Sequence, residues 1–157
     1  EKDRDPRRPE RPVLEMCLGA VALALGMVMS GTGNLKALQA LREVRSRIDK
    51  ELTYGQHMAL SMAIGLVFLG GGTCALGRSD EAIGALVVAL FPRFPSHSYD
   101  NQYHLQALRH LYVLAVEERS LQTVDVHSGE QVFCPVEVGL KDESMLSLVT
   151  PCLLPEL

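Results

Sequence analysis

The stretch "MAIGLVFLGGGTCALG", residues 62–77, contains the pattern with the most direct link to chemistry. Gly70-Gly71-Gly72-Thr73-Cys74-Ala75 fits the loose form G-x-G-x-x-A. In dinucleotide-binding enzymes such a loop follows a strand, and its backbone N–H groups hold the pyrophosphate. This interpretation places a strand at 63–69 and makes the chain a small NAD(P)-dependent oxidoreductase that uses the 70–75 loop.

The histidines and cysteines give less support to a catalytic or metal site. His97-Ser98 with Asp100 has the residue types of a triad, but such close neighbours suit a helix cap better, and no G-x-S-x-G is present. His104 and His110 are six apart, whereas ligands on one helix face are three or four apart. The cysteines at 17, 74, 134 and 152 lack zinc spacing and indicate free thiols. We therefore predict no catalytic residue, no metal, no cofactor and no small-molecule ligand.

Composition sets the class of protein. The 157 residues suffice for one domain, and 47% of them are apolar, which allows a buried core. The net charge is −4 and no basic stripe is present, which argues against nucleic-acid binding. The charged, proline-containing residues 1–12 are expected to form a disordered arm. The apolar run 16–29 is shorter than the ~20 residues that span a bilayer, so we predict no membrane contact, with a membrane hairpin of the two apolar runs as a weaker alternative.

An internal repeat determines which elements position the glycines. "AVALALGMVMSGTG" (20–33) and "ALSMAIGLVFLGGG" (59–72) match with a displacement of 39 residues and six identical positions. A period near 40 is typical of stacked helical units. A dinucleotide fingerprint occurs once and after a strand, whereas this glycine pair occurs twice and after runs that are too long for strands. The repeat therefore favours helices over the oxidoreductase.

The repeat gives each glycine a structural role. Gly26 and Gly65 lie inside the apolar runs, where glycine costs about 1 kcal/mol relative to alanine, so a close approach of a neighbouring helix is expected at both. The other repeat glycines are expected to end each helix in the left-handed conformation: Gly31, Gly33, Gly70 and Gly72.

Further elements complete the predicted architecture. A second helix follows each turn, "NLKALQALREVRSRI" and "SDEAIGALVVALF", the latter capped by Ser79 or Asp80. A third helix over 98–118 has Leu105, Leu108, Tyr112 and Ala115 on one face, capped by Ser98 or Asp100. "LQTVDV" and "QVFCPVEV" flank a hairpin turn at Ser128-Gly129. The fold class is mainly α: a disordered arm (1–12), helical repeats (13–118) and a β-containing segment (119–157).

Several of these stretches resemble a known family. "HMALSMAIGLVFLGGG", "ALVVALFPRFPSHSYDNQYHLQALRHLYVLAVE" and "LLPEL" resemble subunit 1, the large scaffold subunit, of the anaphase-promoting complex or cyclosome. "LGMVMSGTGNLKAL" fits the proteasome/cyclosome repeats of that family. The resemblance is closest at 54–117 and returns at 153–157, while residues before Val13 and the region 123–150 are expected to match poorly.

The resemblance implies a non-enzymatic function. Family members build a closed α-solenoid, or toroid, of paired helices from such repeats, and the subunit holds together a ubiquitin ligase that controls mitotic progression. It implies that this chain is a much shorter piece of such a scaffold. The expected partners are other subunits of the complex, and the expected location is the nucleus and cytoplasm.

Overall fold

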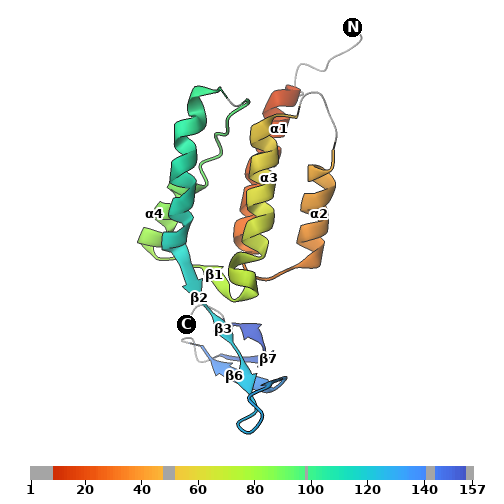
Figure 1. Cartoon of the computed structure of the whole chain (residues 1–157), viewed down its shortest axis with the longest axis vertical. Coiled ribbons are helices and arrows are strands. Elements are labelled where there is room, and N and C mark those ends of the chain that lie inside the picture. The colour runs from red at the N-terminus through yellow and green to blue at the C-terminus, as the bar shows by residue number, and fades with distance from the viewer. Residues whose placement is uncertain (1–8, 48–51, 98, 141–143, 155–157) are drawn as a thin grey trace.

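The computed structural model describes residues 9–47, 52–97, 99–140 and 144–154, with the backbone alone at 101–105. Helices form one layer of the molecule and short strands lie beneath it (Figure 1). The prediction of a mainly α fold with a small β segment is confirmed. The α-helices are α1 (Arg11–Val28), α2 (Leu35–Arg45), α3 (Tyr54–Val67) and α4 (Asp80–Ala89). Two 3₁₀ helices, η1 (Leu69–Gly72) and η2 (Asn101–Ala115), follow α3 and α4.

Side-chain caps begin three of the helices. The Asn34 side chain accepts a hydrogen bond from the Ala37 N–H, and Ser79 accepts one from the Ala82 N–H. Thr53 and Gln56 form a reciprocal capping box at α3. The two matched caps, Asn34 and Ser79, are 45 residues apart, so α2 and α4 align with that offset.

Glycines in the left-handed conformation end the repeated helices α1 and α3. Their φ angles are 70° at Gly31 and 58° at Gly33 after α1, and 59° at Gly70 and 90° at Gly72 after α3. Gly71, which the sequence did not single out, is also left-handed. Since positive φ is costly for residues with a Cβ, these positions favour glycine.

The helical face predicted for the third helix is partly wrong. Leu108 is 41% exposed, and Arg109 beside it is buried. The reason is that η2 is a 3₁₀ helix with three residues per turn, so Gln106, Arg109, Tyr112 and Ala115 share its inner face. The predicted cap Ser98 and the side chains of Leu105 and His104 lie outside the described residues, and Asp100 accepts hydrogen bonds from Ser96.

In the described part of the chain, eight short strands form four antiparallel pairs. β1 (Cys74–Leu76) pairs with β2 (Val116–Glu118), and β3 (Ser120–Leu121) with β8 (Cys152–Leu153). β4 (Thr123–Val124) and β5 (Gln131–Val132) form the hairpin predicted around Gly129, and β6 (Pro135–Gly139) pairs with β7 (Met145–Val149). Two boundaries differ from the predicted ones: α1 begins at Arg11 inside the arm, and β2 begins at Val116 inside the helical region.

Two hydrophobic clusters join the helices. Leu41 of α2 packs with Ala22 of α1 and with Leu60, Ala63 and Val67 of α3 in the first cluster. The second cluster brings together α1, α3, η1 and the end of α4 through these residues: Leu23, Ala59, Leu66, Leu69, Ala89 and Leu90. The most extensive helix contacts are α1 with α3 and α4 with η2. In Figure 1, α2 lies on one side of α1 and α3, and α4 lies with η2 on the other.

Candidate functional site

At one point of their contact, α1 and α3 approach closely through residues without large side chains. A Cβ built at Gly26 would lie 2.8 Å from both the Cα and the carbonyl oxygen of Ala63. Both of those atoms belong to the backbone of α3, which a side-chain rotation cannot move away. Gly26 therefore permits the close approach that the sequence predicts. The first repeated unit consists of α1 and α2 and the second of α3 and α4, and the two units meet at this point.

The matching prediction for Gly65 is wrong within the described part of the chain. Nothing lies within 4 Å of a Cβ built there, and the residue is exposed. The physical reason is that η2, the helix that follows α4 along the chain, packs on α4 and not on α3.

This difference between two equivalent glycines gives a direct test. We expect Gly26→Ala to lower the free energy of unfolding by about 1–3 kcal/mol, because the added methyl overpacks the helix contact. Gly65→Ala should leave stability unchanged or raise it by up to about 1 kcal/mol, because alanine favours the helix. Urea unfolding followed by circular dichroism measures both; equal effects of the two substitutions would contradict the assigned contact.

Hydrogen bonds from the first glycine turn tie one unit to the next. The Gly31 N–H donates to the Leu66 carbonyl at 3.0 Å, and the Gly33 N–H donates to the Val67 carbonyl at 2.9 Å. These two carbonyls belong to the last turn of α3, which leaves its C=O groups without intrahelical partners. The turn after α1 thus caps the end of α3.

The same arrangement recurs at the next junction. The Gly77 N–H, directly after β1, donates to the carbonyl of Ala115, the last residue of η2, at 2.7 Å. The Arg119 N–H returns a hydrogen bond to the Thr73 carbonyl at 3.1 Å, beside the β1–β2 pair. Each junction between units therefore combines a turn, the end of the following helix and backbone hydrogen bonds.

Arg109 holds the segment that follows α4. Its side chain is buried, with 6% of the residue exposed, and its guanidinium donates to the carbonyls of Ala89, Phe91 and Arg93. The guanidinium also lies over the Phe94 ring, 4.2 Å from its centroid. Desolvation lowers the pKa of Arg109 below its ordinary value. Arg109 therefore caps the end of α4 and fixes the path of residues 91–94.

Sequence reasoning missed Arg109. The residue stands in "LQALRHLYVLA", and an α-helical interpretation places it beside the apolar face and toward solvent. One feature of the sequence could have indicated that Arg109 is buried: it precedes Tyr112 by three residues and Ala115 by six. Residues with this spacing share a face only when a helix has three residues per turn.

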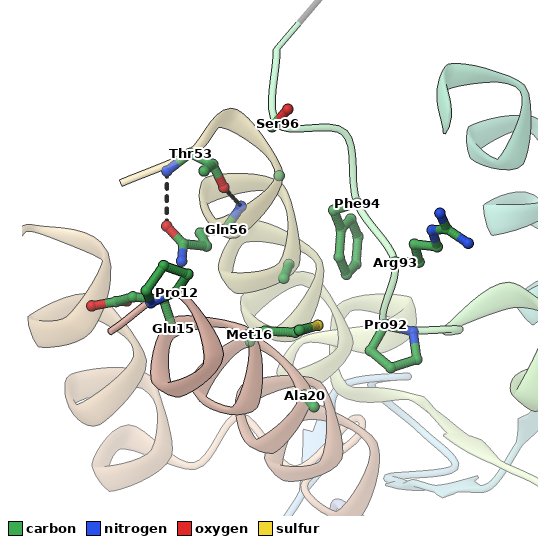
Figure 2. Close-up of a pocket in the computed structure, with 13 residues that line it drawn as sticks. Pro12, Glu15, Met16, Ala20, Thr53, Gln56, Pro92, Arg93, Phe94 and Ser96 are labelled. Carbon is green, nitrogen blue, oxygen red and sulfur yellow. Dashed lines mark hydrogen bonds between the residues drawn. The ribbon is translucent and has the colours of Figure 1, made fainter. Parts of the chain in front are cut away.

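A pocket of about 530 Å³ lies where α1, α3 and the 92–96 segment meet. Met16 extends from α1 toward Pro92 and Phe94 of that segment (Figure 2). Gly55 of α3 allows the segment to lie close, because a Cβ there would overlap Phe94 and Pro95.

Four polar side chains of this pocket, those of Glu15, Thr53, Gln56 and Ser96, are engaged in structural interactions. Glu15 forms an ion pair with Arg47 at 2.6 Å, and Thr53 and Gln56 bond each other's backbone N–H groups (Figure 2). Ser96 donates to Asp100. These interactions hold the helix ends and the 92–96 segment in place. The polar groups around the pocket therefore stabilise the fold.

Among the described residues, those considered for chemistry are not brought together as sites. The strand at 63–69 that the oxidoreductase requires is wrong, because α3 covers those positions as far as Val67. His97 stacks on the Tyr99 ring, with centroids 3.8 Å apart, and His110 is exposed. Among the described residues, no three His, Cys, Asp or Glu side chains are placed to share a metal ion.

α1 is long and apolar enough to cross a membrane by length and composition alone. It has 18 residues and a mean hydropathy of 1.6, and it is the one such helix in the described part of the chain. Length and composition alone do not distinguish a membrane span from the core helix of a soluble protein or from a signal sequence; here 22% of this stretch is buried, and α1 packs along α3.

Comparisons with known proteins identify the family. The family described as the APC1 fifth domain matches residues 2–117. Anaphase-promoting complex subunit 1 of Dictyostelium discoideum is 51% identical over 152 residues, which cover 94% of this chain and 7% of that protein. The human protein of the same name is 50% identical over 149 residues, which cover 92% of this chain and 8% of that protein. A protein of Emericella nidulans named "Negative regulator of mitosis" is 44% identical over 150 residues, or 96% of this chain and 7% of its own length.

Two consequences follow from these alignments. The chain spans less than a tenth of the length of these relatives. The alignments cover 92–96% of the chain, so they extend into the region 123–150, for which the sequence alone predicted a poor match. The family model itself ends at residue 117, so the quality of the match over 123–150 stays a prediction. The family match over 116 of the 157 residues and these alignments establish that the chain belongs to the family of the APC1 fifth domain, found in subunit 1 of the anaphase-promoting complex.

Proposed function

We propose that this chain is a non-catalytic scaffold segment of an anaphase-promoting complex, a multisubunit ubiquitin ligase that controls mitotic progression. The observation that carries the proposal is the 50–51% identity over more than nine-tenths of the chain to proteins named as subunit 1 of that complex. The geometry agrees with it, since the pocket's polar groups serve the fold and the glycines serve contacts between units. The partners are other subunits of the complex, and the site of action is the nucleus and cytoplasm.

We further propose that the helical units belong to an α-solenoid, in which another unit of the same protein packs on the free face of α1. Leu60, Ala63 and Val67 of α3 are buried against α1, each with at most 2% exposed. With the 39-residue offset, the equivalent residues of α1 are Val21, Ala24 and Val28. Those three are exposed, Val21 at 64% and Val28 at 80%. The face that receives a helix on α3 is therefore present and uncovered on α1.

This part of the proposal predicts an effect that depends on the length of the chain. Val28→Asp should change the stability of the 157-residue chain by less than about 0.5 kcal/mol, because Val28 is exposed there. In the complete protein, the same substitution should destabilise the repeats by several kcal/mol, because a carboxylate would be buried under the preceding unit. Hydrogen exchange at α1 compares the two forms, and equal protection of the wild-type and variant complete proteins would refute the solenoid.

Affinity purification from dividing cells tests the scaffold function. The complete protein should recover other subunits of the anaphase-promoting complex, and removal of residues 9–154 should reduce that recovery. If the recovery were unchanged, this segment would have no scaffold role. Saturable binding of NAD or NADP, measured by calorimetry, would instead favour the oxidoreductase alternative.

A further inference from the structure

α4 has an apolar outer face where the equivalent helix α2 has a polar one. The 45-residue offset set by the matched caps Asn34 and Ser79 aligns Val87, Val88 and Phe91 with these residues of α2: Arg42, Glu43 and Ser46. All six are exposed, and on α4 the exposed fractions are 63%, 45% and 54%. The same position in the unit is thus solvated on α2, whereas α4 leaves apolar area in water. An apolar patch of this kind marks an interaction surface.

This face forms a groove together with η2. Leu108 of η2 is 41% exposed and lines the groove beside Val87, Val88 and Phe91, around a volume of about 250 Å³. Arg109 closes its floor, with its guanidinium held by the three carbonyls after α4. The groove is therefore preformed and held on a rigid support.

A following unit of the same stack would not cover this groove. The next helix along the chain already lies beside each second helix: α3 packs on α2, and η2 packs on α4. The apolar face of α4 is exposed although η2 already packs on this helix. A covering element must therefore approach from outside the stack of units.

Charge along α4 indicates what would fit. Asp80 and Glu81 begin the helix and are exposed, and Glu81 lies on the same side as Gly84, Val88 and Phe91 by helical spacing. The groove itself is lined by apolar residues and Arg109, and the same side of α4 carries acidic residues at the start of the helix, beyond the groove. The complement of this surface is an amphipathic helix with apolar residues spaced by three and four and a lysine or arginine at one end.

We propose that the groove between α4 and η2 binds an amphipathic helix of another subunit of the complex, with its basic end beside Asp80 and Glu81. This inference rests on the proposed scaffold function, because it requires that other subunits assemble on this protein. It assigns one docking position to the second unit and none to the equivalent face of α2.

Site-specific photocross-linking in the assembled complex tests the occupant. A benzophenone amino acid is introduced at position 91 of the complete protein, and at position 46 as the matched control on α2. We expect cross-links from position 91 to a helical segment of one identified subunit, and none from position 46. Cross-links from position 91 only to the same protein would overturn the proposal in favour of an intramolecular cover, and the absence of any cross-link at 91 would overturn it as well.

A pair of substitutions tests the apolar face without disturbing the core. Val87→Arg with Val88→Glu gives α4 the side chains that α2 carries, and both positions are exposed. We expect at least a tenfold loss of that one subunit from the purified complex, while the other subunits are retained. The control, Arg42→Ala with Glu43→Ala on α2, should lose none. Full retention in the α4 variant refutes the docking site alone, whereas failure of the wild-type protein to recover any subunit refutes the scaffold function.

Discussion

Replacing Arg109 by methionine is expected to lower the free energy of unfolding by about 3 kcal/mol or more, because it removes the shared donor of three carbonyls at the end of α4. A buried carbonyl left without a partner costs about 1–3 kcal/mol, which applies to buried Ala89, whereas the Phe91 carbonyl also accepts from the Arg93 N–H. Methionine fills much of the volume, so the loss is one of hydrogen bonding rather than of packing. Urea unfolding followed by circular dichroism gives the change in stability.

Two further variants isolate the role of the guanidinium. Arg109→Lys should recover part of the stability at most, because an ammonium group does not present the planar fork that reaches carbonyls in different directions. Arg42→Met, on the exposed face of α2, should change stability by less than about 0.5 kcal/mol. Faster hydrogen exchange at residues 91–95 in the Arg109 variant would identify the segment that is released. Wild-type stability in Arg109→Met would show that the carbonyls find other partners.

The second large effect is expected at Gly31. Gly31→Ala should destabilise the chain by about 3 kcal/mol or more, since it combines a left-handed backbone with a collision. Gly31 has φ 70°, and a Cβ there would overlap the Cys74 carbonyl oxygen. Relief of the overlap would pull the turn away from the carbonyls of Leu66 and Val67, which it caps.

Gly129 is the matched control for this substitution. Its φ is 71°, nearly that of Gly31, but nothing lies within 4 Å of a Cβ built there. Gly129→Ala should therefore cost only the conformational part, about 1–2 kcal/mol. Thermal unfolding measures the stability lost in each variant. The difference between the two losses gives the part due to the overlap with Cys74, because the backbone conformation is nearly the same at both glycines. Equal losses at the two positions would mean that the junction yields to the methyl group at no cost.

Most of the helical layer follows from the sequence because its determinants are local or repeated. The 39-residue repeat predicts α1 and α3 as helices, and the glycines after each of them have the left-handed conformation that ends a helix. Ser79 caps α4 as predicted, because a serine side chain satisfies an N–H group within the first turn. The turn at Gly129 follows from equally local chemistry.

The remaining features depend on distant parts of the chain. β1 forms only because residues 116–118 come to lie beside Cys74, and three residues carry no strand signal of their own. The 3₁₀ form of η2 decides whether Leu108 or Arg109 faces inward, and apolar spacing alone favours the wrong one. Gly65 has a local sequence similar to that of Gly26 but nothing within 4 Å of a Cβ built there, so a close contact at this position depends on where η2 packs.

The candidate site was predictable only in its simplest part. The close approach at Gly26 could be inferred from a costly glycine placed twice at equivalent positions. The cluster around Arg109 could not, since its acceptors are backbone carbonyls 16 to 20 residues earlier in the chain, and every residue has a carbonyl. The apolar groove on α4 emerges only when α4 is compared with α2, because a valine in a helix is unremarkable without that reference.

The pairing of β1 with β2 has a consequence for how this segment can change in length. The β1–β2 ladder and the Gly77–Ala115 hydrogen bond hold the two ends of residues 77–115 together. This stretch, which contains α4, the 91–100 connection and η2, is therefore a loop closed at its ends. Residues added to that connection outside the part that Arg109 holds and that packs on Gly55 lengthen a loop whose ends are already joined, and doubling the length of a flexible loop raises the entropic cost by only about 0.6 kcal/mol. Insertions there should be tolerated far better than in the Gly31–Gly33 turn, where one extra residue would shift the donors away from the end of α3.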